Sequence, residues 1–266
     1  MTLTVLLSAM FLKDENYIDS LNVESDAVVI NQCDANLKRK SGHITPKGKN
    51  VNVTYIETTE RGLSKSRNMA IENAEGDILC LCDNDVEYEE GYADTILDVY
   101  RRHADADVVV SFIKRPERSN PITDKEKRMG YLSVLKIFSP EISFKKEAVK
   151  DIRFNESFGA GAEYIMGEEN IFLYECLKRH KKIYYNPKMI AATRDEESTW
   201  FKGYDEKFFI SRGANYAAMS GIFSYVLIIQ FALRKTRLYR DNFTRRDAVK
   251  IMLRGRKEYL GKVLGA

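Results

Sequence analysis

The sequence predicts an α/β protein with a mainly parallel central sheet flanked by helices, followed by a helical extension at the C-terminal end. Short segments rich in Val, Leu and Ile indicate strands at residues 3–9, 27–30, 51–56, 78–82 and 108–112. Residues 51–56 alternate, whereas residues 78–82 and 108–112 are continuously apolar, as fits strands covered on both faces. Helical patterns lie between or after them, at residues 64–74, 93–103 and 168–180. Strands that alternate with helices in this way are typical of a Rossmann-like sheet with right-handed crossovers.

The length of 266 residues and the 44% hydrophobic content suffice for one large core and an appendage. We place a main domain at residues 1–208 and an extension at residues 209–266. The first residues, MTLTVLLSAM, have no basic n-region, so we expect no secretory signal. The four cysteines form no CxxC pair, and Cys80 and Cys82 read as small buried apolar groups on one face of a strand. The three histidines are scattered, which makes a zinc enzyme unexpected.

Two polar segments separate the predicted strands. Residues 34–50 are basic and contain glycine and proline, so we expect a surface loop there. Residues 113–130 form another polar, proline-containing connection that is long enough to act as a lid over a site.

Two carboxylates follow directly on the apolar run ILCLC. In open α/β sheets, ligands bind beyond the carboxyl ends of the strands. Asp83 and Asp85 stand at such an end, separated by Asn84, and can together hold a hard divalent cation such as Mg²⁺ or Mn²⁺. The alternative is an ordinary polar turn, which Asp and Asn both favour.

The stretch ERGLSKSRNMAIENAEGD, residues 60–77, precedes this strand. Its glycine turn and Ser64, a helix-capping residue, offer free backbone N–H groups and a positive dipole end to an anion. Arg67 adds a planar guanidinium suited to phosphate. The alternative is a capped surface helix. Because the two carboxylates follow so closely, we favour a site in which this segment binds phosphate and the carboxylates bind a metal ion.

The run GLSKSRNMAIENAEGDILCLCDNDV resembles the core of family 2 glycosyltransferases, in which a Gly-Leu-Ser…Arg-Asn helix precedes a strand and an Asp-x-Asp motif. The run FNESFGAGAEYIMGEENIF, residues 154–172, is similar to the acceptor-side segment of that family. The run STWFKGYDEKFF, residues 198–209, is similar to bacterial capsule and surface-polysaccharide members. The resemblance covers most of residues 1–210 and implies a GT-A fold and inverting sugar transfer from a nucleotide-sugar.

The resemblance also implies roles for individual residues. Asp85 is expected to be the direct metal ligand, with Asp83 near the ribose and the metal. The expected nucleotide-sugar contacts are Ser8, Ala9, Gln32, Asp34, Gly62, Ser64, Arg67, Asp83 and Asn84. The expected acceptor or sugar contacts are Gly159, Gly161 and Trp200, the last either as a sugar-stacking platform or as a core residue.

The general base is expected in Gly167-Glu168-Glu169, because an inverting transfer needs a carboxylate to take the proton of the attacking hydroxyl. Family members usually carry Glu-Asp here, which puts Glu169 at the base position and Glu168 beside it. The alternative is that both acids merely favour a helix N-terminus. Another departure is Asn31-Gln32 where relatives carry an acidic pair, although amides still hydrogen-bond uracil, so UDP stays the favoured nucleotide.

The C-terminal part has a distinct charge and hydropathy pattern. Residues 214–233 contain no charged side chain, and residues 234–266 carry eleven Lys or Arg against three acids. We favour helices that lie on the cytoplasmic leaflet, because this arrangement fits both features. The alternatives, in decreasing order of preference, are a helix packed on the enzyme or in a homodimer, a membrane span, and nucleic-acid binding.

The sequence thus predicts a metal-dependent glycosyltransferase that adds a hexosyl or N-acetylhexosaminyl group to a lipid-linked oligosaccharide. The acceptor implied by the resemblance is a polyprenyl-diphosphate-linked oligosaccharide of bacterial capsular or surface polysaccharide. The enzyme would be cytoplasmic and peripheral on the inner face of the cell membrane, without a nucleic-acid partner. Two alternatives are a non-catalytic membrane-associated scaffold and a sugar-1-phosphate nucleotidyltransferase, which would need a Gly-rich loop after the first strand that SAMFLKDENY lacks.

Overall fold

The structure is a computed structural model that describes residues 1–14, 16–194 and 203–265. The chain divides into two compact units, each described by itself below. Unit 1 comprises Met1–Arg61, Lys65–Arg153 and Leu173–Glu196, and unit 2 comprises Gly62–Ser64, Phe154–Phe172 and Glu197–Ala266. Residues 62–64 and 154–172 thus group with the C-terminal helices, whereas the sequence places the domain boundary at residue 208 as a single cut.

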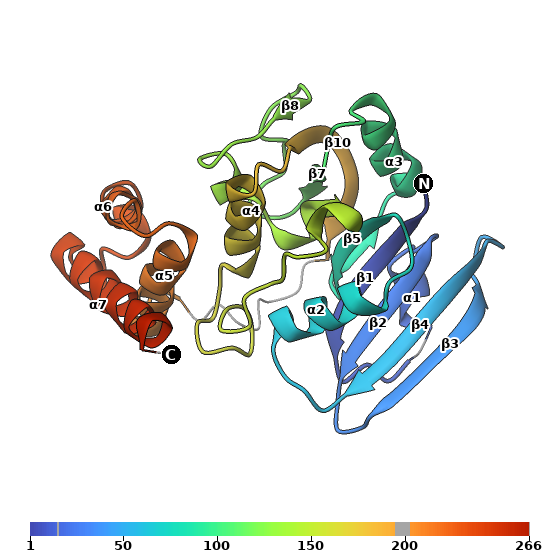
Figure 1. Ribbon diagram of the computed structural model, residues 1–266, viewed down its shortest axis with the longest axis horizontal. Coiled ribbons are helices and arrows are strands. Elements are labelled where there is room, and N and C mark those ends of the chain that lie inside the picture. Colours follow the sequence, from blue (N-terminus) through green and yellow to red (C-terminus); the bar gives the residue numbers. More distant parts are fainter. Residues whose placement is uncertain (15, 195–202, 266) are drawn as a thin grey trace. The chain divides into compact units, whose positions relative to one another are not determined.

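Unit 1 is built on a sheet whose described strands run in the order β3-β4-β2-β1-β5-β9-β7-β10-β6, with β8 paired to β10 (Figure 1). Its strands are β1 (Leu3–Met10), β2 (Asp26–Gln32), β3 (Leu37–Ile44), β4 (Asn50–Thr58), β5 (Ile78–Asp83), β6 (Val86–Tyr88), β7 (Val108–Lys114), β8 (Lys127–Arg128), β9 (Ile142–Lys145) and β10 (Ile183–Thr193).

The sheet is parallel in its β4-β2-β1-β5 part and mixed elsewhere. The pairs β1–β2, β1–β5 and β2–β4 are parallel, as is β7–β10, whereas β9 runs antiparallel to both β5 and β7. The five predicted strands are confirmed. The continuous apolar runs at residues 78–82 and 108–112 are buried throughout, as expected where both faces of a strand are covered.

The helices of unit 1 cover the sheet faces. They are α1 (Tyr17–Ser20), α2 (Leu63–Asn73), α3 (Tyr92–Arg102) and α4 (Glu168–Lys178), with one-turn 3₁₀ helices at Val134–Lys136, Ser139–Glu141 and Glu147–Val149. The first residues of α2 and of α4 belong to unit 2. The apolar stripe of α3, which includes Ile96 and Tyr100, packs in one core with Val5 of β1 and Cys80 and Cys82 of β5. The prediction that these two cysteines are buried apolar groups is confirmed.

The prediction of a surface loop at residues 34–50 is wrong. This segment contains β3, which pairs antiparallel with β4 from Leu37 to Ile44. Most of its side chains are exposed, so no apolar alternation marks it in the sequence. Its basic residues suit an edge strand, because charge on an open edge opposes pairing with other chains.

From residue 203 to residue 265, unit 2 contains three longer helices, α5 (Glu206–Met219), α6 (Ser224–Arg234) and α7 (Arg245–Leu264), and a one-turn 3₁₀ helix at Thr236–Leu238. The uncharged stretch 214–233 is therefore shared between α5 and α6, with a turn at residues 221–223. Gly213 of α5 and Gly255 of α7 permit close packing of these two helices. A Cβ on Gly213 would lie 1.9 Å from the carbonyl oxygen of Met252, and one on Gly255 would lie 2.1 Å from that of Ile210. No described helix is long and apolar enough to cross a membrane.

Candidate functional site

The carboxyl ends of three parallel strands bring the first group of predicted residues to one edge of the sheet. In the register of β1 with its neighbours, Ser8 lies opposite Asp83 of β5, and Met10 lies opposite Gln32 of β2. Ser8, Ala9 and Gln32 are all buried. These residues lie at one edge of the sheet because strands in parallel register end on the same side.

Hydrogen bonds fix two of these side chains. Ser66 Oγ of α2 donates to Ser8 Oγ at 2.8 Å, which ties the helix to the end of β1. Gln32 Nε2 donates to the carbonyl oxygen of Glu60 at 3.0 Å, in the segment that leads to α2. Asp34 lies further out, exposed and paired with Arg61 at 2.7 Å.

Arg67 is buried in the protein, whereas an arginine that binds a ligand directly is expected to be accessible. Its side chain is 1% exposed, and Nη2 donates to Asp83 Oδ1 at 2.9 Å and to Ser139 Oγ at 2.8 Å. A buried guanidinium is costly unless it is paired, so Asp83 compensates its charge and is in turn held in place. The structure therefore makes Arg67 a partner of the first aspartate of the DND run.

The turn Asp83–Asn84–Asp85 leads directly from β5 into β6, and all three residues are half-buried. Its backbone is anchored on both sides. Tyr17 Oη donates to the carbonyl oxygen of Asn84 at 2.8 Å, and the Arg194 amide donates to that of Asp85 at 2.8 Å. The carboxylates thus stand on a fixed turn at a strand end.

The donor set at this turn suits a hard cation shared with a ligand. Among the described residues, no three His, Cys, Asp or Glu side chains are grouped so as to hold a metal by themselves. Mg²⁺ and similar ions are bound by one or two carboxylates together with substrate phosphates, rather than by an all-protein cage. Asp83 and Asp85 fit that second pattern.

In unit 2, the predicted Gly62 and Ser64 lie against the predicted acceptor segment. The Leu63 amide donates to the carbonyl oxygen of Ala160 at 2.9 Å, and Ser64 Oγ donates to that of Phe158 at 2.7 Å. A Cβ on Gly161 would lie 3.4 Å from Gly62 Cα, so the two backbones approach closely. Ser64 therefore holds a loop in unit 2 through its side chain.

The two predicted bases begin helix α4. The preceding Gly167 has φ +90°, a conformation that favours glycine, and its carbonyl oxygen accepts a hydrogen bond from Asn215 Nδ2 at 2.8 Å. Glu168 is buried, and Glu169 is half-buried. A Cβ on Gly159 would lie 3.3 Å from the carboxylate of Glu168, so the FGAGA loop leaves room for this side chain.

Helix α5 holds the loop that leads into α4. Ser211 Oγ accepts from the Ile165 amide at 3.2 Å, and Asn215, one helical turn further on, binds the carbonyl oxygen of Gly167. Both side chains are buried. The sequence does not single out either residue as functional, although polar residues at i and i+4 in an apolar stretch are the signal that could have found them.

Trp200 lies outside the described residues. Its expected role as a sugar platform stays a prediction.

The family model described as Glycosyl transferase family 2 matches residues 35–165. No curated protein matches the chain. Three solved structures of TarS from S. aureus, residues 1–349, have a similar fold. The first, described as TarS 1–349, has a TM-score of 0.58 and 16% identity, and the match covers 91% of this chain and 74% of the TarS chain. The complex with UDP has a TM-score of 0.61 and 15% identity, and the match covers 100% of this chain and 92% of the TarS chain. The complex with UDP-GlcNAc has a TM-score of 0.58 and 16% identity, and the match covers 98% of this chain and 79% of the TarS chain.

These likenesses bear on the fold. A mycobacterial protein with a TM-score of 0.52 and 16% identity is also similar, over 83% of this chain and 75% of its own. The sheet, its flanking helices and the C-terminal helices together form a GT-A α/β fold, as the sequence predicts.

Proposed function

We propose that this chain is an inverting, metal-dependent glycosyltransferase. It would move a sugar from a nucleotide-sugar, with UDP as the favoured nucleotide, to a hydroxyl of a lipid-linked oligosaccharide in bacterial capsular or surface polysaccharide synthesis. The family match over residues 35–165 and the fold shared with TarS, solved with UDP and with UDP-GlcNAc, support the class of reaction. The observation that carries the proposal is the meeting of Ser8, Gln32 and Asp83 at one sheet edge, beside the DND turn.

Donor binding follows from the chemistry of that edge. The ends of β1 and β2 offer hydroxyl and amide groups to a uracil base and ribose, with Asp83 at the end of β5 beside them. Asp83 is held by Arg67 and is thus oriented before a ligand arrives. Arg67 acts through Asp83 in this proposal, in place of the direct contact with the diphosphate that the resemblance implies.

Asp85 and Asp83 would hold Mn²⁺ or Mg²⁺ together with the donor diphosphate. Such a cation, when bound, stabilises the negative charge that develops on the departing nucleoside diphosphate. The anchored turn keeps both carboxylates at the strand end without rearrangement, which favours preorganised binding.

The proton of the acceptor hydroxyl would pass to a carboxylate at the start of α4. Glu169 is the favoured base because it is the more open of the two, whereas Glu168 is buried beside the FGAGA loop. The helix N-terminus stabilises the ionised form that a base requires. The positive φ of Gly159, Gly161 and Gly167 shapes the backbone of this acceptor segment.

The proposal is tested by a panel of nucleotide sugars that includes UDP-GlcNAc. Thermal shift reports binding, because a ligand that binds only the folded state raises Tm. Release of UDP with Mn²⁺, in the absence and presence of a chelator, reports turnover. We expect Asp85→Asn to lower turnover by about 100-fold or more, since metal stabilisation of a leaving group contributes several kcal/mol.

Asp98→Asn, on the exposed surface of α3, is the matched control and should keep full turnover. If no nucleotide sugar raises Tm or is turned over, the chain is no glycosyltransferase, and a scaffold role takes its place. Equal turnover by the parent and Asp85→Asn would refute the metal assignment alone.

A further inference from the structure

One side of helix α6 in unit 2 is apolar and exposed. Ile222, Phe223, Val226, Ile229 and Leu233, here called the α6 face, are between 52 and 83% exposed. Ile222 and Phe223 lie in the turn before the helix, and Val226, Ile229 and Leu233 follow within it at intervals of three and four residues, which places these three along one side of α6. The opposite side, with Leu227, Ile228 and Ala232, is buried within the chain. An α-helix that is apolar on both sides is expected to have both sides covered.

Positive charge flanks both ends of the α6 face. At the N-terminal end, the guanidinium of Arg256 lies 3.9 Å from the ring centre of Tyr225 and donates to Ser224 Oγ at 2.8 Å. At the C-terminal end, Arg234 closes α6, and Arg245 Nε donates to Thr236 Oγ1 at 2.9 Å. This arrangement suits a membrane surface, where the apolar helix face would meet the acyl chains and the cations would meet the lipid phosphates.

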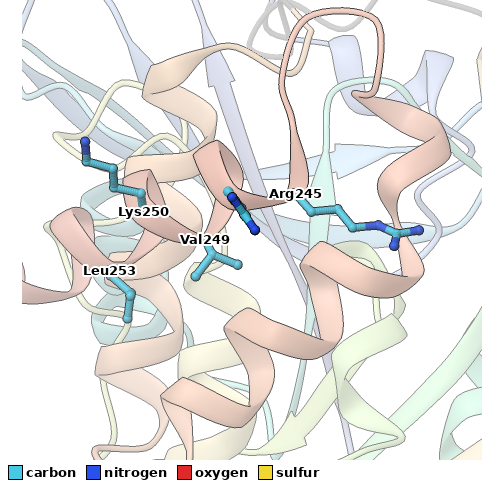
Figure 2. A pocket seen from close by; sticks show the side chains of 5 residues that line it. Arg245, Val249, Lys250 and Leu253 are labelled. Carbon is cyan, nitrogen blue, oxygen red and sulfur yellow. The ribbon is translucent and has the colours of Figure 1, made fainter.

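Helix α7 carries a shallow depression of the same character. Val249 and Leu253 form its apolar part, with Arg245 and Lys250 on the same helix (Figure 2). Arg246 also lines the depression. Two of the three acids of residues 234–266 are paired with other cations, Asp241 with Arg240 and Glu258 with Arg254. Asp247 caps the start of α7 at Thr244, and its carboxylate also interacts with Lys250.

We infer that the α6 face and the α7 depression form a surface that binds an anionic phospholipid bilayer, with the α6 face inserted at the level of the first acyl carbons. A second copy of the chain is a less suitable occupant. A two-fold interface on the α6 face would bring the same cation-flanked patch against itself, and like charges oppose such pairing. Anionic headgroups supply the opposite charge. The inference deepens the proposed function, because a lipid-linked acceptor is presented at a membrane.

The test is co-sedimentation of the full chain with vesicles of equal parts phosphatidylcholine and phosphatidylglycerol, against vesicles of phosphatidylcholine alone. The double variant Ile222→Asp/Val226→Asp places two negative charges on the α6 face. Each charge near an anionic surface changes partitioning about fivefold, so we expect a loss of about 25-fold or more, with the lost apolar insertion in addition. The matched control is Ile44→Asp/Leu132→Asp, which changes two exposed apolar residues of unit 1 by the same net charge. The fraction of this control variant that sediments with anionic vesicles should be close to that of the parent.

A second pair of variants tests the α7 depression. Arg246→Gln/Lys250→Gln should weaken binding to the anionic vesicles about 25-fold, by about fivefold for each cation removed. Lys127→Gln/Arg128→Gln, two exposed residues of β8, is the control with the same change in charge. Added salt should weaken binding by the parent, because it screens exposed charges.

Equal weakening by the α6 and control variants would refute the inference, and so would undiminished binding of the α6 variant. A parent that dimerises in analytical ultracentrifugation and is made monomeric by Ile222→Asp/Val226→Asp, without binding vesicles, would show that a second copy covers the α6 face. Turnover of nucleotide sugars is measured separately and without lipid. Vesicle binding without turnover would therefore refute the proposed function alone, and turnover without vesicle binding would refute the membrane surface alone.

Discussion

Gly167→Ala tests whether α5 and the loop before α4 are packed as the structure has them. Gly167 has φ +90°, and a Cβ built on it would lie 2.2 Å from Asn215 Nδ2 and 2.5 Å from Asn215 Cγ. The amide of Asn215 is itself buried and bonded to the carbonyl oxygen of Gly167. The added methyl group can therefore be accommodated only if the amide moves and its hydrogen bond breaks.

The expected cost has two parts. Holding an L-residue at positive φ costs about 1–2 kcal/mol. Overpacking of a buried site costs a further 1–3 kcal/mol or so. We therefore expect Gly167→Ala to lower the free energy of unfolding by about 2–5 kcal/mol. Gly203→Ala is the matched control in the same unit, because Gly203 has φ +103° and no atom of the described residues lies within 4 Å of a Cβ built on it. It should lose only the backbone part.

The assay is urea unfolding followed by circular dichroism, with turnover of the same samples measured below the transition. The expected difference in the free energy of unfolding between the two variants is about 1–3 kcal/mol, and it measures the steric clash with Asn215 alone. If Gly167→Ala were no less stable than Gly203→Ala, the contact between α5 and this loop would be wrong, and α5 could not hold the residues before Glu168.

Three further predictions follow from buried groups. Asn215→Ala should destabilise the fold by about 0.5–1.5 kcal/mol, because the buried carbonyl of Gly167 loses the Asn215 donor and keeps the Ile171 amide, and urea unfolding measures this. Native protein at pH 8 should react with iodoacetamide at the half-buried Cys33 and not at the buried thiols of Cys80, Cys82 and Cys176, as mass spectrometry would show; burial raises the pKa of Cys80 and of Cys176 to about 12, and the thiolate is the reactive form. The free energy of unfolding should fall from about pH 9 towards pH 12, since the folded state keeps protons on thiols that the unfolded chain, with a thiol pKa of 9.0, releases; a flat profile over this range would contradict these raised pKa values.

Continuous apolar runs predicted the parallel half of the sheet well. Residues 78–82 and 108–112 are apolar at every or nearly every position because helices and loops cover both sheet faces there. The same rule could not find β3, whose side chains are mostly exposed. Nor did it find β10, which is interrupted by Pro187 and by register shifts between Asn186 and Ala191. Edge position and bulges are properties of the assembled sheet, which local hydropathy does not encode.

The part of the candidate site that lies at the strand ends was predictable from the sequence. Motif spacing located the ends of β1, β2 and β5, and the structure aligns Ser8 with Asp83 and Ala9 with Asn31. The burial of Arg67 was not predictable, because the second partner of its guanidinium, Ser139, lies 72 residues away in the sequence. The same holds for Asn215, which meets Gly167 from a helix 48 residues further along.

The burial of Arg67 changes how variants of the DND turn should be interpreted. Removing the Asp83 carboxylate takes one negative charge away from a guanidinium that is 1% exposed, and breaking a buried ion pair from one side costs about 3–5 kcal/mol. Asp83 is 21% exposed, so water screens the remaining charge and the cost should lie below that range. An inactive Asp83→Ala protein could therefore have lost its fold at the end of β5, its donor site, or both. Asp85→Asn keeps the size of the side chain and leaves the Arg67–Asp83 pair intact. Loss of Mn²⁺-dependent turnover in Asp85→Asn, at unchanged Tm without ligand, is thus the result that separates cation binding from the stability of the turn.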